Sequence, residues 1–426
     1  MTQVRQKAFV LFPYLKRALP DNRSPEAFLA EAVSLTQAID LQILGTDVLP
    51  LREIKAKAYL GKGTIERLYP MAHAADVVIM NCALSPLQQR NLEKEWQTKV
   101  IDKTALILEI FGQRARTKEG RLQVELAHLT YARSRLVRSW THLERQRGGS
   151  GFLGGPGETQ IELDRRLIDD DIIKIKKELE EVKKTRALHR QARRRVPYPI
   201  VALVGYTNAG KSTLFNRLTH ADVMAKDMLF ATLDPTMRQI KLPHGTNVIL
   251  SDTVGFISDL PTELVMAFRA TLEEVLEADV IIHVRDYAHP DTEAQKHDVE
   301  EVLTDLGLGE EVGKGLIEAL NKVDLLTEEE QNCLNTQKMR QENEWPISAI
   351  TGQGIDDLLA RVEAELSKSR TVLDISIPIE RGDLLAALYR QGQILSRKDN
   401  TKTIYLTVAL PPQHLETYLP YQRKKK

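Results

Sequence analysis

The stretch Gly205-Tyr206-Thr207-Asn208-Ala209-Gly210-Lys211-Ser212 follows an apolar run, residues 200–204, and leads through Thr213 into an amphipathic segment that ends at residue 218. A strand, a glycine-rich loop and a helix in this order form a cradle for the phosphates of a nucleotide. Glycine lets backbone N–H groups turn toward the phosphates, and the helix N-terminus adds partial positive charge. We expect Lys211 to contact the β- and γ-phosphates and the Ser212 hydroxyl to bind Mg²⁺. A glycine-containing turn can match this pattern by chance, so the assignment of a nucleotide site also depends on the other motifs of the chain.

Two segments downstream have the residues that sense a γ-phosphate. Phe230-Ala231-Thr232-Leu233-Asp234-Pro235-Thr236 offers Thr232, whose hydroxyl and carbonyl could hold Mg²⁺ and the γ-phosphate, with Thr236 as a competitor. We count Phe230 and Asp234 of this segment among the nucleotide-contacting residues. The apolar run 248–251 then leads into Asp252-Thr253-Val254-Gly255, where Asp252 would hold Mg²⁺ through water and the Gly255 N–H would contact the γ-phosphate.

Two later segments predict selectivity for guanine. Asn321-Lys322-Val323-Asp324 follows a strand-like run, and the Asp324 carboxylate can accept from N1–H and the 2-amino group of guanine, which adenine does not offer. Asn321 would support the loop and Lys322 would cover the base. In Ser348-Ala349-Ile350 a backbone N–H can donate to guanine O6. The order and spacing of all these segments indicate a guanine-nucleotide hydrolase.

The position after Gly255 bears on the rate of hydrolysis. It is Phe256, where many such enzymes have a glutamine that orients the attacking water. We assign catalysis to Lys211, Thr232 and Gly255, and expect slow hydrolysis until a partner supplies the missing group. His283 lies in the apolar run 280–284, and we interpret it as a core histidine rather than a base.

Residues 113–197 have the periodicity of two paired helices. Apolar side chains recur at steps of three and four, with Arg133 and Arg165 at two of the expected core positions. The two series are Leu122, Leu126, Leu129, Leu136, Trp140 and Leu143, and Ile161, Ile168, Ile172, Ile175, Leu179 and Val182. The segment contains 21 lysines and arginines but 12 aspartates and glutamates, a net charge of +9 in a chain whose total is zero. An antiparallel hairpin with such a charge favours a polyanion such as RNA, and a merely solvated helical face is the alternative.

The loop between the two predicted helices, Gly148–Gly157, is rich in glycine and carries Phe152 and Leu153. An exposed ring that can stack on a base fits insertion into folded RNA. The alternative is a loop folded back on its own hairpin.

Changes in composition and the positions of helix-breaking residues suggest four parts in a chain of 426 residues. We predict a small α/β domain over 1–112, the hairpin over 113–197, a nucleotide-binding domain over 198–368 and a small α/β domain over 369–426. Gly61-Lys62-Gly63-Thr64 lacks the phosphate-loop spacing, and we interpret it as a turn before a helix. The N-terminus lacks a signal peptide, no run is long enough to span a bilayer, and the two cysteines suggest a reducing compartment. We therefore expect a cytoplasmic protein with no stable membrane insertion, leaving peripheral membrane association open.

Together these motifs resemble the HflX family of translation-factor-class GTPases. The resemblance covers essentially the whole chain and is most specific at residues 205–216, 230–236, 252–257 and 321–324 and in the loop that continues to Arg166. It implies a P-loop GTPase domain with a mostly parallel sheet, preceded by an α/β domain and a helical hairpin and followed by a small C-terminal domain. Phe256 is similar to the apolar residue that this family has in place of glutamine.

The resemblance also implies partners and a role. It implies binding of the large (50S) subunit and the 70S ribosome through 23S rRNA, stimulation of GTP hydrolysis to GDP and phosphate, and splitting of stalled ribosomes under heat or other stress. We expect a monomer. Two alternatives stay open: a GTPase of ribosome assembly or RNA folding without splitting activity, and a module whose docking to a protein complex is controlled by GTP.

Overall fold

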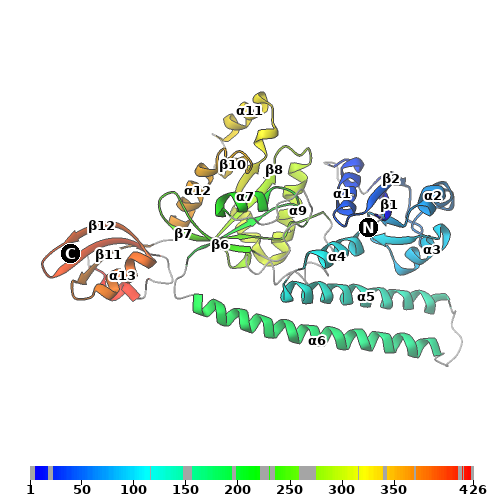
Figure 1. The fold of residues 1–426 in the computed structure, drawn as a ribbon, viewed down its shortest axis with the longest axis horizontal. Helices are drawn as coiled ribbons and strands as arrows, with labels where there is room; N and C mark the ends of the chain where they lie inside the picture. Colours follow the sequence, from blue (N-terminus) through cyan, green and yellow to red (C-terminus); the bar gives the residue numbers. More distant parts are fainter. Residues whose placement is uncertain are drawn as a thin grey trace.

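The structure is a computed structural model of residues 1–426. It describes all of them except 1–4, 18–22, 116, 147–155, 194–197, 221–229, 231–235, 259–274, 315, 339–342, 369–370, 411–414, 416 and 424–426. The described strands form three sheets, which lie one after another along the long axis of the molecule (Figure 1).

The first sheet is four-stranded and parallel, in the order β2-β1-β3-β4. Its strands are β1 (Lys7–Leu15), β2 (Gln42–Leu51), β3 (Val77–Met80) and β4 (Lys99–Asp102). Its helices are α1 (Pro25–Gln37), α2 (Lys62–Ala74), α3 (Pro86–Trp96) and α4 (Lys103–Arg114). Ser24-Pro25 and Ser85-Pro86 predict helix starts, and both serines cap helices that begin with proline. The predicted turn at 61–64 is Gly61, the N-cap of α2, followed by the first helical residues, 62–64.

Alternate residues of β1 pack into different cores, as in a strand buried on both faces. Ala8 and Val10 pack with α1 and α4, whereas Phe9 and Leu11 pack with α2 and α3. The core that contains α1 and α4 extends without interruption into the second sheet. There Phe111 of α4 meets Phe230 edge to face, with ring centroids 4.6 Å apart. The first two sheets therefore share one hydrophobic core.

The second sheet is six-stranded, in the order β10-β9-β8-β5-β7-β6, and only β6 runs antiparallel to its neighbour. Its strands are β5 (Ile200–Val204), β6 (Thr236–Lys241), β7 (Asn247–Asp252), β8 (Val280–Asp286), β9 (Ile317–Asn321) and β10 (Glu344–Pro346). Its helices are α7 (Lys211–Thr219), α9 (Thr292–Leu303), α10 (Gly309–Lys314), α11 (Glu328–Lys338) and α12 (Ile355–Lys368), with short turns η1 (Thr304–Leu308) and η2 (Val323–Leu325). The predicted fold class, a mostly parallel sheet with helices on both faces, is confirmed.

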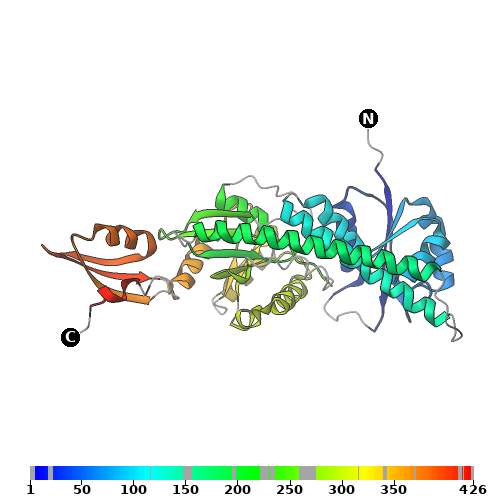
Figure 2. The ribbon, with the colours of Figure 1, turned by 90° about the horizontal axis from the view of Figure 1, so that it is seen from below.

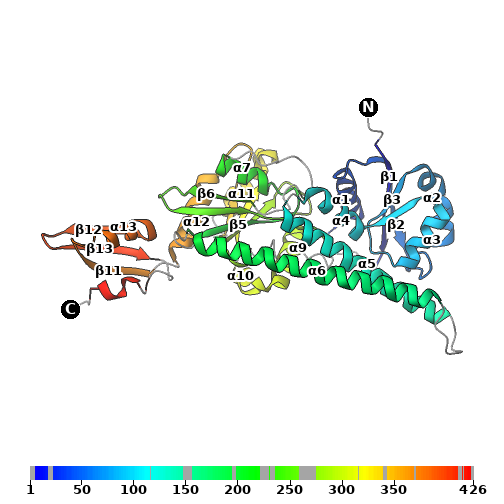
Figure 3. The same ribbon diagram turned by 60° about the horizontal axis from the view of Figure 1, so that its bottom comes forward.

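Two long helices lie side by side along the first two sheets (Figures 1–3). They are α5 (Lys118–Gln146) and α6 (Pro156–Arg193). The predicted apolar seam is present, since Leu122, Ile175 and Leu179 are buried between them. The two arginines at core positions are explained by Asp169, which pairs with Arg133 at 2.8 Å and with Arg165 at 3.8 Å.

The third sheet is antiparallel, in the order β11-β13-β12, and lies at the end of the molecule opposite the first sheet (Figure 1). It consists of β11 (Thr371–Pro378), β12 (Gln393–Asp399) and β13 (Thr403–Leu410), with α13 (Gly382–Gln391) and the turn η3 (Leu419–Tyr421). The runs 372–377 and 403–408 predict two strands and residues 383–390 predict a helix, and β11, β13 and α13 cover these ranges. The edge strand β12 was not anticipated, because five of its seven residues are polar or charged.

Candidate functional site

The glycine-rich loop connects β5 to α7 and has a backbone that other residues could not adopt. Gly205 and Gly210 have φ values of 151° and 94°. A Cβ at Gly205 would lie 2.2 Å from the Val284 carbonyl oxygen, and one at Gly210 would lie 2.2 Å from Asn321 Nδ2. Asn208 also has a positive φ, of 59°. The loop is therefore tightly seated before the start of α7, where the partial positive charge of a helix N-terminus favours an anion.

Lys211 lies at the first position of α7 and is buried. Its Nζ donates to the carbonyl oxygens of Gly205 at 3.0 Å and Tyr206 at 2.8 Å. These bonds use two of the three N–H groups of an ammonium, which leaves one for a phosphate oxygen. Burial lowers the pKa of Lys211 to about 8, although Asp252 acts in the opposite direction. An anionic phosphate would favour the charged form.

The two oxygen ligands predicted for Mg²⁺ lie together. Ser212 Oγ donates to Asp252 Oδ2 at 2.7 Å, where the start of α7 meets the end of β7. A hydroxyl and a carboxylate beside a phosphate site are the hard oxygen donors that Mg²⁺ prefers. The residues therefore fit the ion, and phosphate oxygens and water would supply its remaining ligands.

The segment after Asp252 is bonded to the phosphate loop. Phe256 N–H donates to the Gly205 carbonyl at 3.1 Å, and the Phe256 carbonyl accepts from Thr207 N–H at 2.7 Å. A Cβ at Gly255 would lie 2.9 Å from Thr207 Cγ2 and 3.2 Å from Lys211 Nζ. The Phe256 ring is buried in the shared core. Because a phenyl ring has no polar group, Phe256 cannot orient a water molecule by hydrogen bonding.

Asn321 joins three loops at the guanine side of the site. Its Nδ2 donates to the Ala209 carbonyl at 2.8 Å, and its Oδ1 accepts from Ala349 N–H at 2.9 Å. Lys322 has a positive φ and donates to Asp286 Oδ2 at 2.7 Å. These bonds hold the loop after β9 against both the phosphate loop and the Ser348–Ile350 loop.

Asp324 supplies a buried acceptor that suits a base. Its Oδ1 has no hydrogen-bond partner among the residues that the structure describes. An unpaired buried carboxylate oxygen is costly, so a ligand N–H at this position would be strongly favoured. The N1–H and 2-amino groups of guanine are such donors.

Arg217 is a residue of this region that the sequence did not reveal. Its guanidinium donates to the carbonyl oxygens of Ile350 at 2.6 Å and Thr351 at 2.7 Å, and more weakly to that of Ala349 at 3.4 Å. It therefore fixes the backbone of the loop predicted to contact guanine O6. The pattern GxxxxGKS gives no signal for an arginine five residues after its end, since the partners of Arg217 lie more than 130 residues away.

The remaining predicted residues differ in what can be said of them. Phe230 is buried in the shared core against Phe111, and Thr213 lies in the first turn of α7. Thr232 and Asp234 lie outside the described residues. His283 is buried in β8, and burial together with Arg285 lowers its pKa to about 3, which makes it neutral at physiological pH.

This fold, with its glycine-rich loop between β5 and α7 and its match to a GTPase family model, defines a P-loop GTPase that hydrolyses GTP. Four family models match successive parts of the chain. They describe a GTP-binding GTPase N-terminal region (residues 26–112), a GTP-binding GTPase middle region (114–193), a 50S ribosome-binding GTPase (200–322) and an HflX C-terminal domain (333–417). The chain belongs to the HflX family.

Known relatives are similar over most of their length. GTPase HflX of Magnetococcus marinus is 47% identical over 389 residues, which cover 91% of this chain and 89% of the relative. GTPase HflX of Escherichia coli is 43% identical over 387 residues, 90% of this chain and 89% of the relative. Among solved structures, a GTP-binding protein from Sulfolobus solfataricus in complex with GDP is 24% identical, with a TM-score of 0.45, and the match covers 84% of this chain and 98% of that one. In the part of the chain that the structure describes, no helix is both long and apolar enough to cross a membrane.

Proposed function

We propose that this GTPase is a ribosome-associated switch. In its GTP- and Mg²⁺-bound form it docks on the large (50S) ribosomal subunit, separates the subunits of stalled 70S ribosomes, and is released after hydrolysis. The single observation that carries the proposal is that the paired helices α5 and α6 belong to a segment, residues 113–197, with a net charge of +9, and that α6 extends beside the GTP-binding part of the same chain (Figure 2). The family model described as a 50S ribosome-binding GTPase supports it.

The hairpin provides the docking surface in this proposal. Lys174, Lys176, Lys177 and Lys184 of α6 are exposed, so they are accessible to the phosphates of 23S rRNA. Contacts of this kind release counterions, and the affinity should fall steeply with salt. The loop Gly148–Gly157, whose residues up to 155 lie outside the described part, would insert Phe152 and Leu153 among unpaired bases.

The nucleotide site provides the switch. In the proposal, GTP occupies the loop Gly205–Ser212, Mg²⁺ is held by Ser212, Thr232 and Asp252, and guanine is read by Asp324 and the Ser348–Ile350 loop. Bound Mg²⁺ would neutralise charge that develops on the phosphates. Lys211, Thr232 and the Gly255 N–H would stabilise the γ-phosphate, and the order of their segments would depend on its presence.

The ribosome would complete the catalytic site. Because Phe256 has no group that orients water, hydrolysis by the isolated protein should be slow. We propose that ribosomal contacts supply or reposition this group, so that the GTP-bound form persists until docking has occurred.

Sedimentation with separated subunits tests the docking. The protein loaded with a non-hydrolysable GTP analogue is expected to pellet with 50S subunits, and deletion of residues 148–157 should abolish most of this binding. Lys211→Ala should lose GTP binding and docking together, whereas Lys241→Ala, at an exposed position in β6, should change neither. Docking that is indifferent to the nucleotide, or tight GTP binding by Lys211→Ala, would contradict the proposal.

Two alternatives have distinct outcomes. If the GTP-bound protein binds 50S subunits but intact 70S ribosomes sediment unchanged, the protein acts in assembly or RNA folding. If complexes isolated from cells resist ribonuclease, the hairpin docks on protein. We propose that the chain acts as a monomer in the cytoplasm, which gel filtration and cell fractionation would test.

A further inference from the structure

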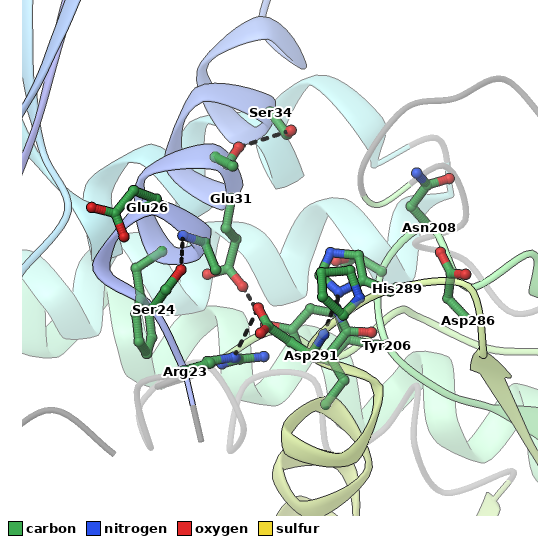
Figure 4. A pocket seen from close by; sticks show the side chains of 16 residues that line it. Arg23, Ser24, Glu26, Glu31, Ser34, Tyr206, Asn208, Asp286, His289 and Asp291 are labelled. Carbon is green, nitrogen blue, oxygen red and sulfur yellow. Dashed lines mark hydrogen bonds and ion pairs between the residues drawn. The ribbon is translucent and has the colours of Figure 1, made fainter. Parts of the chain in front are cut away.

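A glutamate of α1, a helix of the first sheet, contacts residues of the GTPase site. Glu31 of α1 accepts a hydrogen bond from the Tyr206 hydroxyl of the phosphate loop and another, at 2.7 Å, from Ser258 Oγ. Ser258 lies three residues after Gly255. Glu31 therefore contacts both the segment that would hold the phosphates and the segment that would sense the γ-phosphate. Figure 4 shows Glu31 of α1 beside Tyr206.

Further hydrogen bonds close this cluster. The Ser258 N–H donates to the Tyr206 hydroxyl oxygen at 2.8 Å. Lys103 Nζ, at the start of α4, donates to Ser258 Oγ at 3.0 Å and to Glu31 Oε1 at 3.2 Å. The four side chains are nearly inaccessible, with exposed fractions of 12% for Glu31 and 8% for Lys103. Each therefore depends on the others for its hydrogen bonds.

The charge state of Glu31 makes the cluster sensitive to displacement. Burial acts to raise its pKa, but Lys103, the hydrogen bonds from Tyr206 and Ser258, and Arg23 lower it below the ordinary value. The carboxylate is therefore ionised. Moving Ser258 or Tyr206 would remove one of the three donors to this buried charge, and a buried charge that loses a hydrogen bond is destabilised. A shift in either segment should consequently move α1 and α4 as well.

The residue next to Lys103 makes the corresponding connection to the hairpin. Asp102 ends β4, and both of its carboxylate oxygens accept from the Tyr131 hydroxyl of α5, at 2.8 and 2.9 Å. Arg135, one turn further along α5, contacts Asp102 Oδ2 at 3.5 Å and donates to the Tyr131 hydroxyl at 2.6 Å. Asp102 also caps α4 by accepting from Ala105 N–H at 2.9 Å. Asp102 is 2% exposed.

We propose that Glu31, Lys103 and Asp102 form a polar relay through which the nucleotide state of the GTPase site sets the position of α5. One end of the relay consists of Tyr206 and Ser258, and the other of Tyr131. The link between them is short and stiff, because Lys103 and Asp102 are adjacent at the junction of a buried strand and a helix. The relay deepens the proposed switch by naming its internal connection, but it concerns the isolated protein and needs no ribosome.

Amide hydrogen exchange in the full-length protein tests the relay. The exchange rates of residues 118–136 are measured with saturating GDP and with a non-hydrolysable GTP analogue, and should differ by about threefold or more in the unaltered protein. Glu31→Gln removes the charge at one end, and Tyr131→Phe removes one hydroxyl at the other while leaving the nucleotide site untouched. Both variants should abolish the difference.

A matched control separates the relay from a general effect of altering α1. Glu26→Gln changes an exposed glutamate in the first turn of the same helix, which is not part of the cluster around Lys103 and Ser258, and should keep the full difference. If Glu31→Gln does not fold, Ser258→Ala takes its place. The relay is overturned if the unaltered protein shows no difference, or if Tyr131→Phe or the Glu31 variant keeps it. Sedimentation with 50S subunits is scored separately, so failure of docking and failure of the relay are distinguishable.

Discussion

The nucleotide site and the helical hairpin are built in opposite ways. At the nucleotide site, loops from distant parts of the sequence are joined by buried hydrogen bonds, as Asn321 joins the Ala209 and Ala349 loops. In the hairpin, two helices meet along one apolar seam, and the polar contacts of Asp169 are partly exposed. The difference indicates that single substitutions should be severe at the first region and mild at the second.

The largest effect is expected at the base-reading residue. Asp324→Asn replaces an acceptor with an amide that cannot accept from both N1–H and the 2-amino group of guanine. We expect GTP affinity to fall by roughly a hundredfold and xanthosine triphosphate, which has a carbonyl at position 2, to bind better than GTP. Isothermal titration calorimetry measures both. Asp356→Asn, at an exposed position of α12, is the control, and unchanged GTP affinity in Asp324→Asn would refute the assignment.

A smaller effect is expected at Arg217, which contacts the loop predicted to bind guanine rather than the base itself. Arg217→Ala removes the donors to the Ile350 and Thr351 carbonyls but no group that we expect to touch the nucleotide. The loop should lose its fixed backbone, and GDP affinity should fall by about tenfold. Fluorescent GDP titration checks this, with the exposed Arg238→Ala as control. If the two variants bind GDP equally well, Arg217 does not position the loop.

Affinity should also depend on pH through Lys211. Its pKa is lowered to about 8 without nucleotide, and a bound phosphate should raise it, so binding takes up a proton above pH 8. GTP affinity is therefore expected to decrease by roughly eightfold from pH 7.5 to 9, since each proton taken up costs up to tenfold per pH unit. Calorimetry in buffers of different ionisation enthalpy counts the proton directly. No uptake at pH 9 would contradict this prediction.

The smallest effect is expected in the hairpin. Asp169→Asn removes the ion pairs with Arg133 and Arg165, whose side chains are 43% and 54% exposed. The free energy of unfolding should change by less than about 1 kcal/mol, because solvent screens exposed pairs. Urea denaturation of this variant and of Leu179→Ala, which should cost about 2–5 kcal/mol, makes the comparison. A larger loss in Asp169→Asn would show that the hairpin depends on its charges.

The sequence predicts those features that depend on residues a few positions apart in the chain. The glycines at 205 and 210 and the seam of Leu122 and Leu179 follow from local patterns, and the structure has them where they were expected. The predicted roles of Thr232 and of the hairpin tip stay predictions, because those residues lie outside the described part. Strand β2 was not anticipated, since Gly45 and Pro50 weaken its strand signal and only an edge position tolerates them.

Contacts between distant residues could not be predicted. Glu31 and Tyr206 are 175 positions apart, and a lone glutamate on an amphipathic helix ordinarily faces water. The contacts of Arg217 could not be predicted either, because its acceptors are backbone carbonyls, which every type of residue has. Such contacts are decided by how the layers pack, and a single sequence contains no signal for that packing.

The length of α6 determines how far one end of the helix would move when the other end tilts. With 38 residues, the helix spans about 57 Å. In sequence the next element is β5, the strand that precedes the phosphate loop, with residues 194–199 in between (Figure 3). A tilt of about 5° at that end would swing the far end through about 5 Å, close to one helical turn. A helix of this length would thus act as a lever, converting a small tilt at one end into a displacement of several ångströms at the other.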